Sequence, residues 1–154
     1  GGHLAAATAM LPGHDETTTS KVSSAPNALV LFNPVLITAP LPGATDAQTE
    51  RMEKLRLRLG ADLESMSPYH HIRPGLPPTL ILHGENDKTV PYQTVELFSE
   101  GMMAAGTRCE LVAYPNQGHG FFNAHREDNS AYHETVRQMD EVLVSLGWLN
   151  QQGK

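Results

Sequence analysis

Two loops of this chain each place a titratable side chain just beyond an apolar run, and this pairing limits the possible folds more than any other feature. The run T-L-I-L at residues 79–82 leads into H-G-E-N-D, which ends at Asp87, and the run at residues 110–114 leads into a loop that holds His119 between two glycines. The carboxyl ends of parallel strands meet at one edge of a sheet. The sequence therefore predicts that an acid and a histidine converge at one rim.

Hydrophobic periodicity divides the chain into alternating helices and strands. We expect helices where apolar residues recur every three or four positions, and buried strands where short apolar runs are closed by turn residues. The predicted helices cover residues 3–10, 45–59, 92–105 and 130–146, with Ser130 as the N-cap of the last, and the predicted strands cover residues 28–32, 80–83 and 110–114. Because strands that alternate with helices are joined by right-handed crossovers, we predict an α/β fold with a parallel sheet.

Composition excludes several classes of partner. The 154 residues are 40% hydrophobic, enough for one modest core. Asp and Glu number 17 against 11 Lys and Arg, which gives a formal charge of -6 and makes nucleic acid an unexpected partner. No apolar run approaches the ~20 residues that cross a bilayer, so we predict no membrane span.

The cysteine and histidine content argues against a metal centre. The one cysteine, Cys109, begins an apolar run, so we expect a buried, inert thiol. A single cysteine permits neither an intrachain disulfide nor a cysteine-based zinc cluster. His70 and His71 are adjacent, and adjacent side chains rarely converge on one ion. We therefore predict no metal site.

Asp87 and His119 suit two members of a hydrolytic triad. A carboxylate can accept a hydrogen bond from the Nδ1–H of an imidazole, hold its tautomer and stabilise the imidazolium that forms during proton transfer. The glycines beside His119 leave its ring free to act as a general base. The alternatives are a turn or capping role for Asp87, a loop histidine without a function, and Glu85 as the acid.

The third member of such a triad, a serine on a G-x-S-x-G turn, has no counterpart in the sequence. The serines that are present lack this turn, and a serine without a base and a strained turn is a poor nucleophile. Phe121 and Phe122 follow His119 closely. One interpretation has them line an acyl or aromatic pocket, and the other has them pack the loop down.

Three ordered blocks resemble the α/β-hydrolase superfamily. Residues 82–91, L-H-G-E-N-D-K-T-V-P, look like its acid loop, and residues 116–121, N-Q-G-H-G-F, look like its histidine loop. Residues 1–6, G-G-H-L-A-A, resemble the segment after the nucleophile in esterases and lipases, where the pattern runs G-x-S-A-G-G-H-L-A. Residues 67–80 resemble the approach to the acid strand in carbohydrate-esterase and prolyl-oligopeptidase-like branches. The resemblance extends over essentially the whole chain.

The resemblance implies the C-terminal part of an α/β-hydrolase fold, a three-layer sandwich with three strands and about four helices. Residues 1–154 would form a partial domain, with the N-terminal strands, the oxyanion loop and the nucleophile absent. Asp87 would be the triad acid, His119 the general base, and the serine would precede Gly1 by two positions. The implied substrate is a small-molecule carboxylic ester, with no cofactor. The implied partner is a complementary N-terminal half, without which we expect the chain to be inactive.

Two other functions stay open. The chain is a non-catalytic remnant or split subunit in one, and the C-terminal part of a prolyl-oligopeptidase-type serine peptidase in the other. The helix at residues 45–59 is interpreted as an ordinary crossover helix, with a lid or cap insertion as the alternative. Because the strand at residues 28–32 would have an unpaired edge, we also expect the isolated chain to be marginally stable.

Overall fold

The chain folds around a parallel sheet of three strands in a computed structural model that describes residues 1–11, 23–43, 45–60, 62–124 and 129–150. The strands are β1 (Leu29–Phe32), β2 (Thr79–Gly84) and β3 (Cys109–Tyr114), in the order β1-β2-β3. All pair in parallel, with Leu31 opposite Ile81 and Ile81 opposite Leu111. This confirms the α/β class and the parallel sheet.

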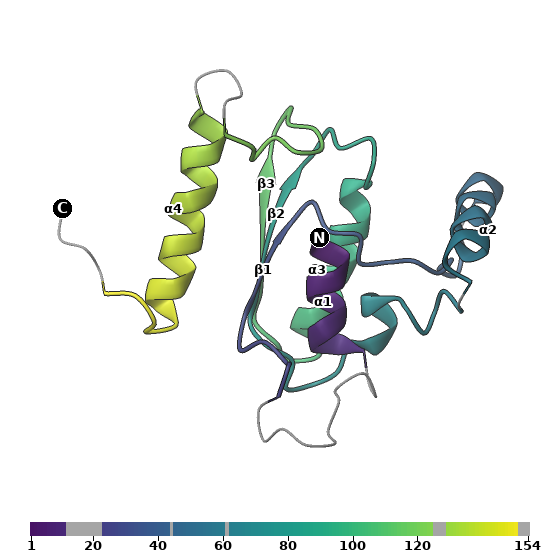
Figure 1. The fold of residues 1–154 in the computed structure, drawn as a ribbon, viewed down its shortest axis with the longest axis horizontal. Helices are drawn as coiled ribbons and strands as arrows, with labels where there is room; N and C mark the ends of the chain where they lie inside the picture. Colours follow the sequence, from purple (N-terminus) through teal and green to yellow (C-terminus); the bar gives the residue numbers. More distant parts are fainter. Residues whose placement is uncertain (12–22, 44, 61, 125–128, 151–154) are drawn as a thin grey trace.

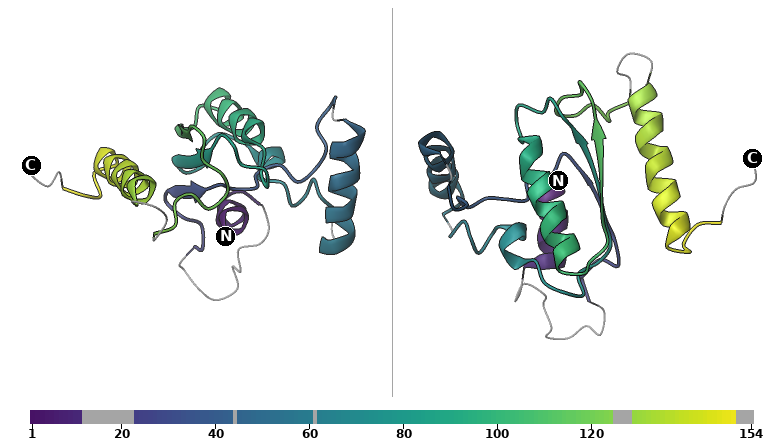
Figure 2. Two further views of the ribbon diagram at one scale, coloured as in Figure 1. Left: turned by 90° about the horizontal axis from the view of Figure 1, so that it is seen from above. Right: turned by 180° about the vertical axis from the view of Figure 1, so that it is seen from behind.

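Helices cover both faces of the sheet and make a three-layer arrangement (Figures 1 and 2). α4 (Ser130–Ser145) lies on one face, and α1 (Gly2–Met10) and α3 (Tyr92–Ala104) lie on the other. Successive side chains of a strand point to opposite faces. Leu80 and Leu82 therefore join the cluster under α4, while Ile81 joins the cluster under α1 and α3. Every residue of β2 is buried, which explains its continuous apolar run.

The predicted elements lie within two residues of the observed ones, with one correction at a helix start. The structure makes Asn129 the N-cap of α4, in the left-handed region at φ 60°, and Ser130 is the first helical residue. The Ser130 N-cap prediction is therefore wrong by one position, because a left-handed asparagine already turns the chain into the helix. The four prolines at residues 67–78 predict a connector, and a short 3₁₀ turn, Pro68–His71, lies within it. The mixture of Pro, Gly, Asp, Thr and Ser at residues 12–27 predicts a surface loop, and most of that range lies outside the described residues.

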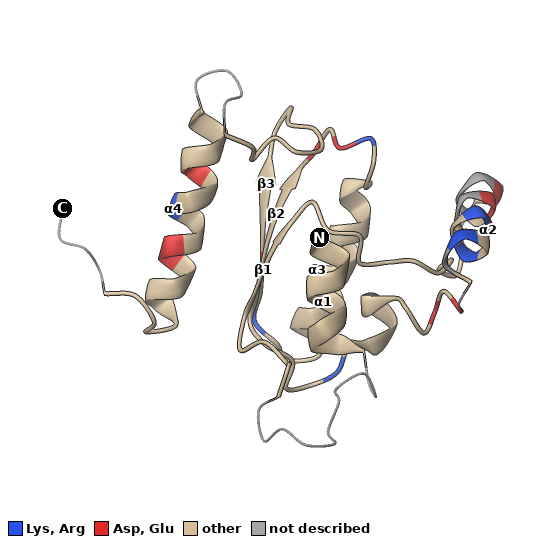
Figure 3. Ribbon diagram, in the orientation of Figure 1, with Lys and Arg blue, Asp and Glu red and all other residues tan. Residues whose placement is uncertain are grey.

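Helix α2 (Asp46–Leu59) overturns the crossover interpretation, because it stands away from both faces of the sheet (Figures 1 and 2). Among its described apolar side chains, Met52 and Leu55 are half-buried and Leu57 is 70% exposed. Charged residues gather on α2 and α4, whereas α1 has no Lys, Arg, Asp or Glu (Figure 3). The face of the sheet opposite α4, where a crossover helix between β1 and β2 would pack, is covered by α1 and α3.

Helix α1 packs closely against the segment that follows β1. A Cβ atom added at Gly2 would lie 2.9 Å from Cβ of Pro34 and 3.4 Å from the carbonyl oxygen of Phe32. This contact needs a residue without a side chain, and it brings the start of α1 to the same end of the sheet as the carboxyl end of β1. None of the helices in the described part of the chain is long and apolar enough to span a membrane.

Candidate active site

The structure brings the predicted acid and histidine into direct contact. Asp87 lies in the loop after β2 and His119 in the loop after β3, and His119 Nδ1 lies 2.8 Å from Asp87 Oδ2. The Asp87 side chain is fully buried, whereas that of His119 is 47% exposed. A neutral imidazole that donates from Nδ1 has its free lone pair on Nε2. The pair therefore presents a basic nitrogen from a half-exposed ring and keeps the carboxylate out of water.

The Asp87 carboxylate is hydrogen-bonded on both oxygens. Its Oδ1 accepts the backbone N–H groups of Thr89 at 2.8 Å and of Val90 at 2.9 Å. Its Oδ2 accepts the side-chain amide of Asn33 at 2.5 Å and the imidazole of His119. Burial alone would raise the pKa of Asp87, but these four donors outweigh it and hold that pKa below its usual range. The acid therefore stays ionised although it is buried.

Backbone contacts lock the acid loop and the histidine loop together. The N–H of Glu85 donates to the carbonyl of Tyr114 at 3.1 Å, and the N–H of Asn86 donates to that of Gln117 at 2.9 Å. A Cβ atom added at Gly84 would lie only 2.3 Å from the Gln117 carbonyl oxygen. Glycine at position 84 therefore lets the two loops approach closely enough for His119 to reach Asp87. The side chain of Glu85, the rival acid, is exposed.

His83 supports the acid loop from inside the protein. Its side chain is fully buried, and Nε2–H donates to the carbonyl of Val90 at 3.0 Å, which closes the loop that holds Asp87. The same nitrogen is 3.5 Å from Asp87 Oδ2, and the ring packs edge-on against Tyr92. Burial is the main cause that lowers the pKa of His83, so the ring is held neutral.

Sequence reasoning did not find Asn33 or His83 as site residues. The sequence pattern indicates Asn33 only as the turn residue that ends the apolar run at 28–32, and His83 only as part of the predicted strand at 80–83. Both stand at the carboxyl ends of strands, the rim where Asp87 was expected. Polar residues at the carboxyl ends of all three strands, and not only those in the loops that follow, are expected at this rim, and Asn33 and His83 are among them.

The two phenylalanines take different positions. Phe121 is 3% exposed, and its ring packs against Tyr114 in the core under α4. Phe122 packs against Phe32 and lines the hollow that contains His119. Phe121 touches Phe122 edge-on at a centroid distance of 5.6 Å. Of the two candidate substrate-binding residues, the structure brings only Phe122 to the hollow.

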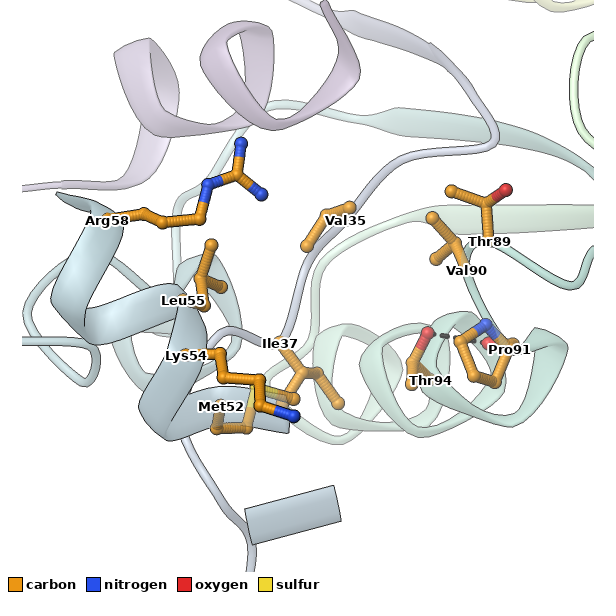
Figure 4. Close-up of a pocket in the computed structure, with 10 residues that line it drawn as sticks. All are labelled: Val35, Ile37, Met52, Lys54, Leu55, Arg58, Thr89, Val90, Pro91 and Thr94. Atoms are coloured by element: carbon orange, nitrogen blue, oxygen red, sulfur yellow. Dashed lines mark hydrogen bonds between the residues drawn. The ribbon is translucent and has the colours of Figure 1, made fainter. Parts of the chain in front are cut away.

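The hollow beside His119 joins the start of α1 to the carboxyl end of β1. It has a volume of about 710 Å³, and Gly1, Gly2, Val35 and Phe122 are among the residues that line it. A second, mainly apolar pocket lies under α2 (Figure 4). The two pockets share three lining residues: Val35, Thr89 and Val90. An apolar space therefore lies next to the hollow that contains the histidine.

The remaining candidate groups do not build a second centre. Cys109 is buried, and burial raises the pKa of its thiol to about 11, so it stays protonated. Within the ranges that the structure describes, no three His, Cys, Asp or Glu residues gather as metal ligands would.

The parallel sheet with helices on both faces, and an acid and a histidine paired at its carboxyl rim, defines a protein of the α/β-hydrolase class. Two family models match: the dienelactone hydrolase family over residues 66–151 and BD-FAE over residues 1–102. The chain belongs to the α/β-hydrolases that these two families describe.

Solved structures of an esterase are similar over almost the whole chain. Esterase 2 of Thermogutta terrifontis is 48% identical in its native form, with 100% of this chain and 55% of that chain covered and a TM-score of 0.86. Its butyrate-bound form is 49% identical, with 99% and 56% covered and a TM-score of 0.87. A Salmonella typhimurium protein provisionally named as a carboxymethylenebutenolidase is 34% identical over 76 residues, 49% of this chain and 27% of that protein. The chain thus spans about half the length of the esterase.

The contact at Gly84 predicts a specific effect of one added methyl group. Gly84→Ala should push the Gln117 backbone away, lower the free energy of unfolding by about 1–3 kcal/mol, and remove the low-field NMR signal of the His119 Nδ1 proton. Gly118→Ala is the matched control, because its new Cβ would meet nothing beyond its chain neighbours nearer than the Asn86 carbonyl oxygen, at 3.9 Å. An unchanged proton signal and stability in Gly84→Ala would show that the loops do not need this glycine.

The buried neutral His83 predicts a loss of stability on mild acidification. Its folded pKa lies below the ordinary 6.5, so the unfolded chain binds more protons and the free energy of unfolding falls as the pH drops through 6.5. His83→Gln should flatten this part of the stability profile, measured by denaturant unfolding at a series of pH values. His133→Gln is the control, because His133 is exposed. Parallel profiles for wild type and His83→Gln would contradict the assignment.

Proposed function

We propose that the chain contributes the acid and the base of a serine esterase, with Asp87 as the acid and His119 as the base. The 2.8 Å contact between His119 Nδ1 and Asp87 Oδ2 carries this proposal. The carboxylate would hold the imidazole in the tautomer that leaves Nε2 free, and would stabilise the imidazolium during proton transfer. Membership of a hydrolase family and similarity to an esterase structure support the same reaction class.

The reaction would proceed by acyl transfer to a serine. His119 Nε2 takes the hydroxyl proton as the serine oxygen attacks the ester carbonyl, and returns that proton to the leaving alcohol. A water molecule then attacks the acyl-enzyme as His119 removes one of its protons, and that proton passes to the serine oxygen when the acyl–serine bond breaks and the carboxylic acid is released. This sequence needs no cofactor.

The serine would lie two positions before Gly1 in the complete enzyme. The resemblance of residues 1–6 to the segment after the nucleophile supports this position. So does the hollow, because Gly1, Gly2 and His119 all line it. A serine that directly precedes this segment would lie near the basic nitrogen without any rearrangement of the sheet.

A complementary N-terminal half would complete the fold. β1 is an edge strand of the described sheet, and Val30 and Phe32 are only partly buried on the face that α4 covers. The esterase structures, of which this chain covers about half, support this assignment of the partner. Pairing along β1 and burial of these two side chains would supply the stability that we expect the isolated chain to lack.

The proposed substrate is a small carboxylic ester. The apolar pocket under α2 is adjacent to the hollow, and Phe122 stands beside His119. A solved structure of the Thermogutta esterase holds butyrate. We propose that α2 acts as a cap over the acyl side of the site, and that Phe121 contributes only by supporting Phe122.

Variants of the complete enzyme test these roles. His119→Ala should abolish turnover of p-nitrophenyl acetate, and Asp87→Asn should lower kcat by about 10⁴ because the imidazole loses its orienting partner. His133→Ala, on the exposed surface, should have no effect. Full activity in either site variant would reassign that residue. Faster cleavage of a proline-containing dipeptide amide than of the ester would favour the peptidase alternative.

The coding sequence before the first codon separates the esterase from a non-catalytic remnant. An open frame that encodes G-x-S-A directly before Gly1 supports the esterase. A stop codon or an initiator methionine at that place would overturn it.

A further inference from the structure

Asn33 occupies an unusual position at the end of β1. Its backbone N–H still donates to the Leu82 carbonyl at 3.0 Å, but its φ of 43° lies in the left-handed region. The side chain is buried, at 4% exposure, and its Nδ2 donates to Asp87 Oδ2. The strand thus ends with its last side chain turned onto the acid.

Packing and backbone geometry alone do not account for an asparagine here. Its Oδ1 is buried with no hydrogen-bond partner among the described residues, which is an energetic cost. Glycine would adopt the same φ without strain and would bury no unpaired oxygen. The benefit that offsets both costs is the hydrogen bond to the Asp87 carboxylate.

We propose that Asn33 is a positioning residue of the acid, whose side-chain amide fixes Asp87 Oδ2 for His119. Two backbone amides already hold Oδ1 of Asp87. Only the hydrogen bonds to Oδ2 then decide how the carboxylate is oriented toward His119. Asn33 and His119 donate to that same oxygen. The amide therefore stabilises the ionised carboxylate and keeps the proton on the imidazole. This inference rests on the proposed function in one respect: it takes Asp87 as the residue that orients a catalytic His119.

Titration of the Asp87 carboxyl in two variants tests this role. The titratable groups beside Asp87 are His119 and His83, and neither is altered. Asn33→Gly removes the donor and also the backbone strain, so the pKa of Asp87 should rise. Asn33→Asp keeps the size and tolerates the same backbone, but places a second carboxyl against Oδ2, so the pKa of Asp87 should rise further. The readout is the NMR shift of the Asp87 carboxyl carbon against pH.

Asn116→Gly is the matched control. Asn116 is also left-handed, at φ 63°, but is exposed and lies in the histidine loop. It should leave the Asp87 titration unchanged. The amide proton signals of Thr89 and Val90 report whether the Oδ1 side of the carboxylate is intact, and we expect them to persist in both Asn33 variants.

The outcomes separate this inference from the proposed function. An unchanged Asp87 titration in both variants, or loss of the Thr89 and Val90 signals in both, would overturn the positioning role. In the complete enzyme, Asn33→Gly should lower kcat for p-nitrophenyl acetate with KM unchanged. A shifted Asp87 titration with unchanged kcat would confirm the contact and count against Asp87 as the acid of the reaction.

Discussion

A buried carboxylate organises the rim of this sheet. An ionised Asp87 without water would be strongly destabilising unless hydrogen bonds replaced its hydration. Four donors do so, and they come from three different parts of the chain: the end of β1, the loop after β2 and the loop after β3. Each of these segments adopts the conformation that aims its donor at the acid. The geometry of the pair with His119 is a consequence of this arrangement.

The donors can converge because the strands are parallel and in register. β2 lies between β1 and β3, so its carboxyl end is flanked by the ends of both neighbours. Gly84 then removes the one side chain that would keep the histidine loop away, and His83 closes the acid loop from below. Backbone hydrogen bonds, rather than long flexible side chains, therefore set the distance between Asp87 and His119.

The parts of this architecture that could be predicted from the sequence are those set by local pattern. β2 is buried on both faces, so its three consecutive apolar residues, Leu80 to Leu82, mark it clearly, and the loop that follows it begins at the rim of the sheet. Asn33 and His83 can be placed at the same rim from the sequence, but their hydrogen-bond partners, 54 and 7 positions away along the chain, do not follow from local pattern. Phe121 and Phe122 are adjacent and alike, and only the tertiary packing decides which of them reaches the hollow.

Sequence periodicity predicts helix α2 but not its position in the fold. Periodicity predicts an amphipathic helix, but it does not say which surface the apolar stripe covers. The stripe is short, and the ion pairs of α2, such as Lys54 with Glu50, are exposed and contribute little to stability. Met52 and Leu55 instead wall the apolar pocket, opposite Val35 and Val90 (Figure 4). The rim around Asp87 and His119 is therefore held by many hydrogen bonds, while the described side chains of α2 that wall the neighbouring pocket are at most half-buried. A change in the α2 sequence can then alter the shape of that pocket without disturbing the hydrogen bonds around Asp87.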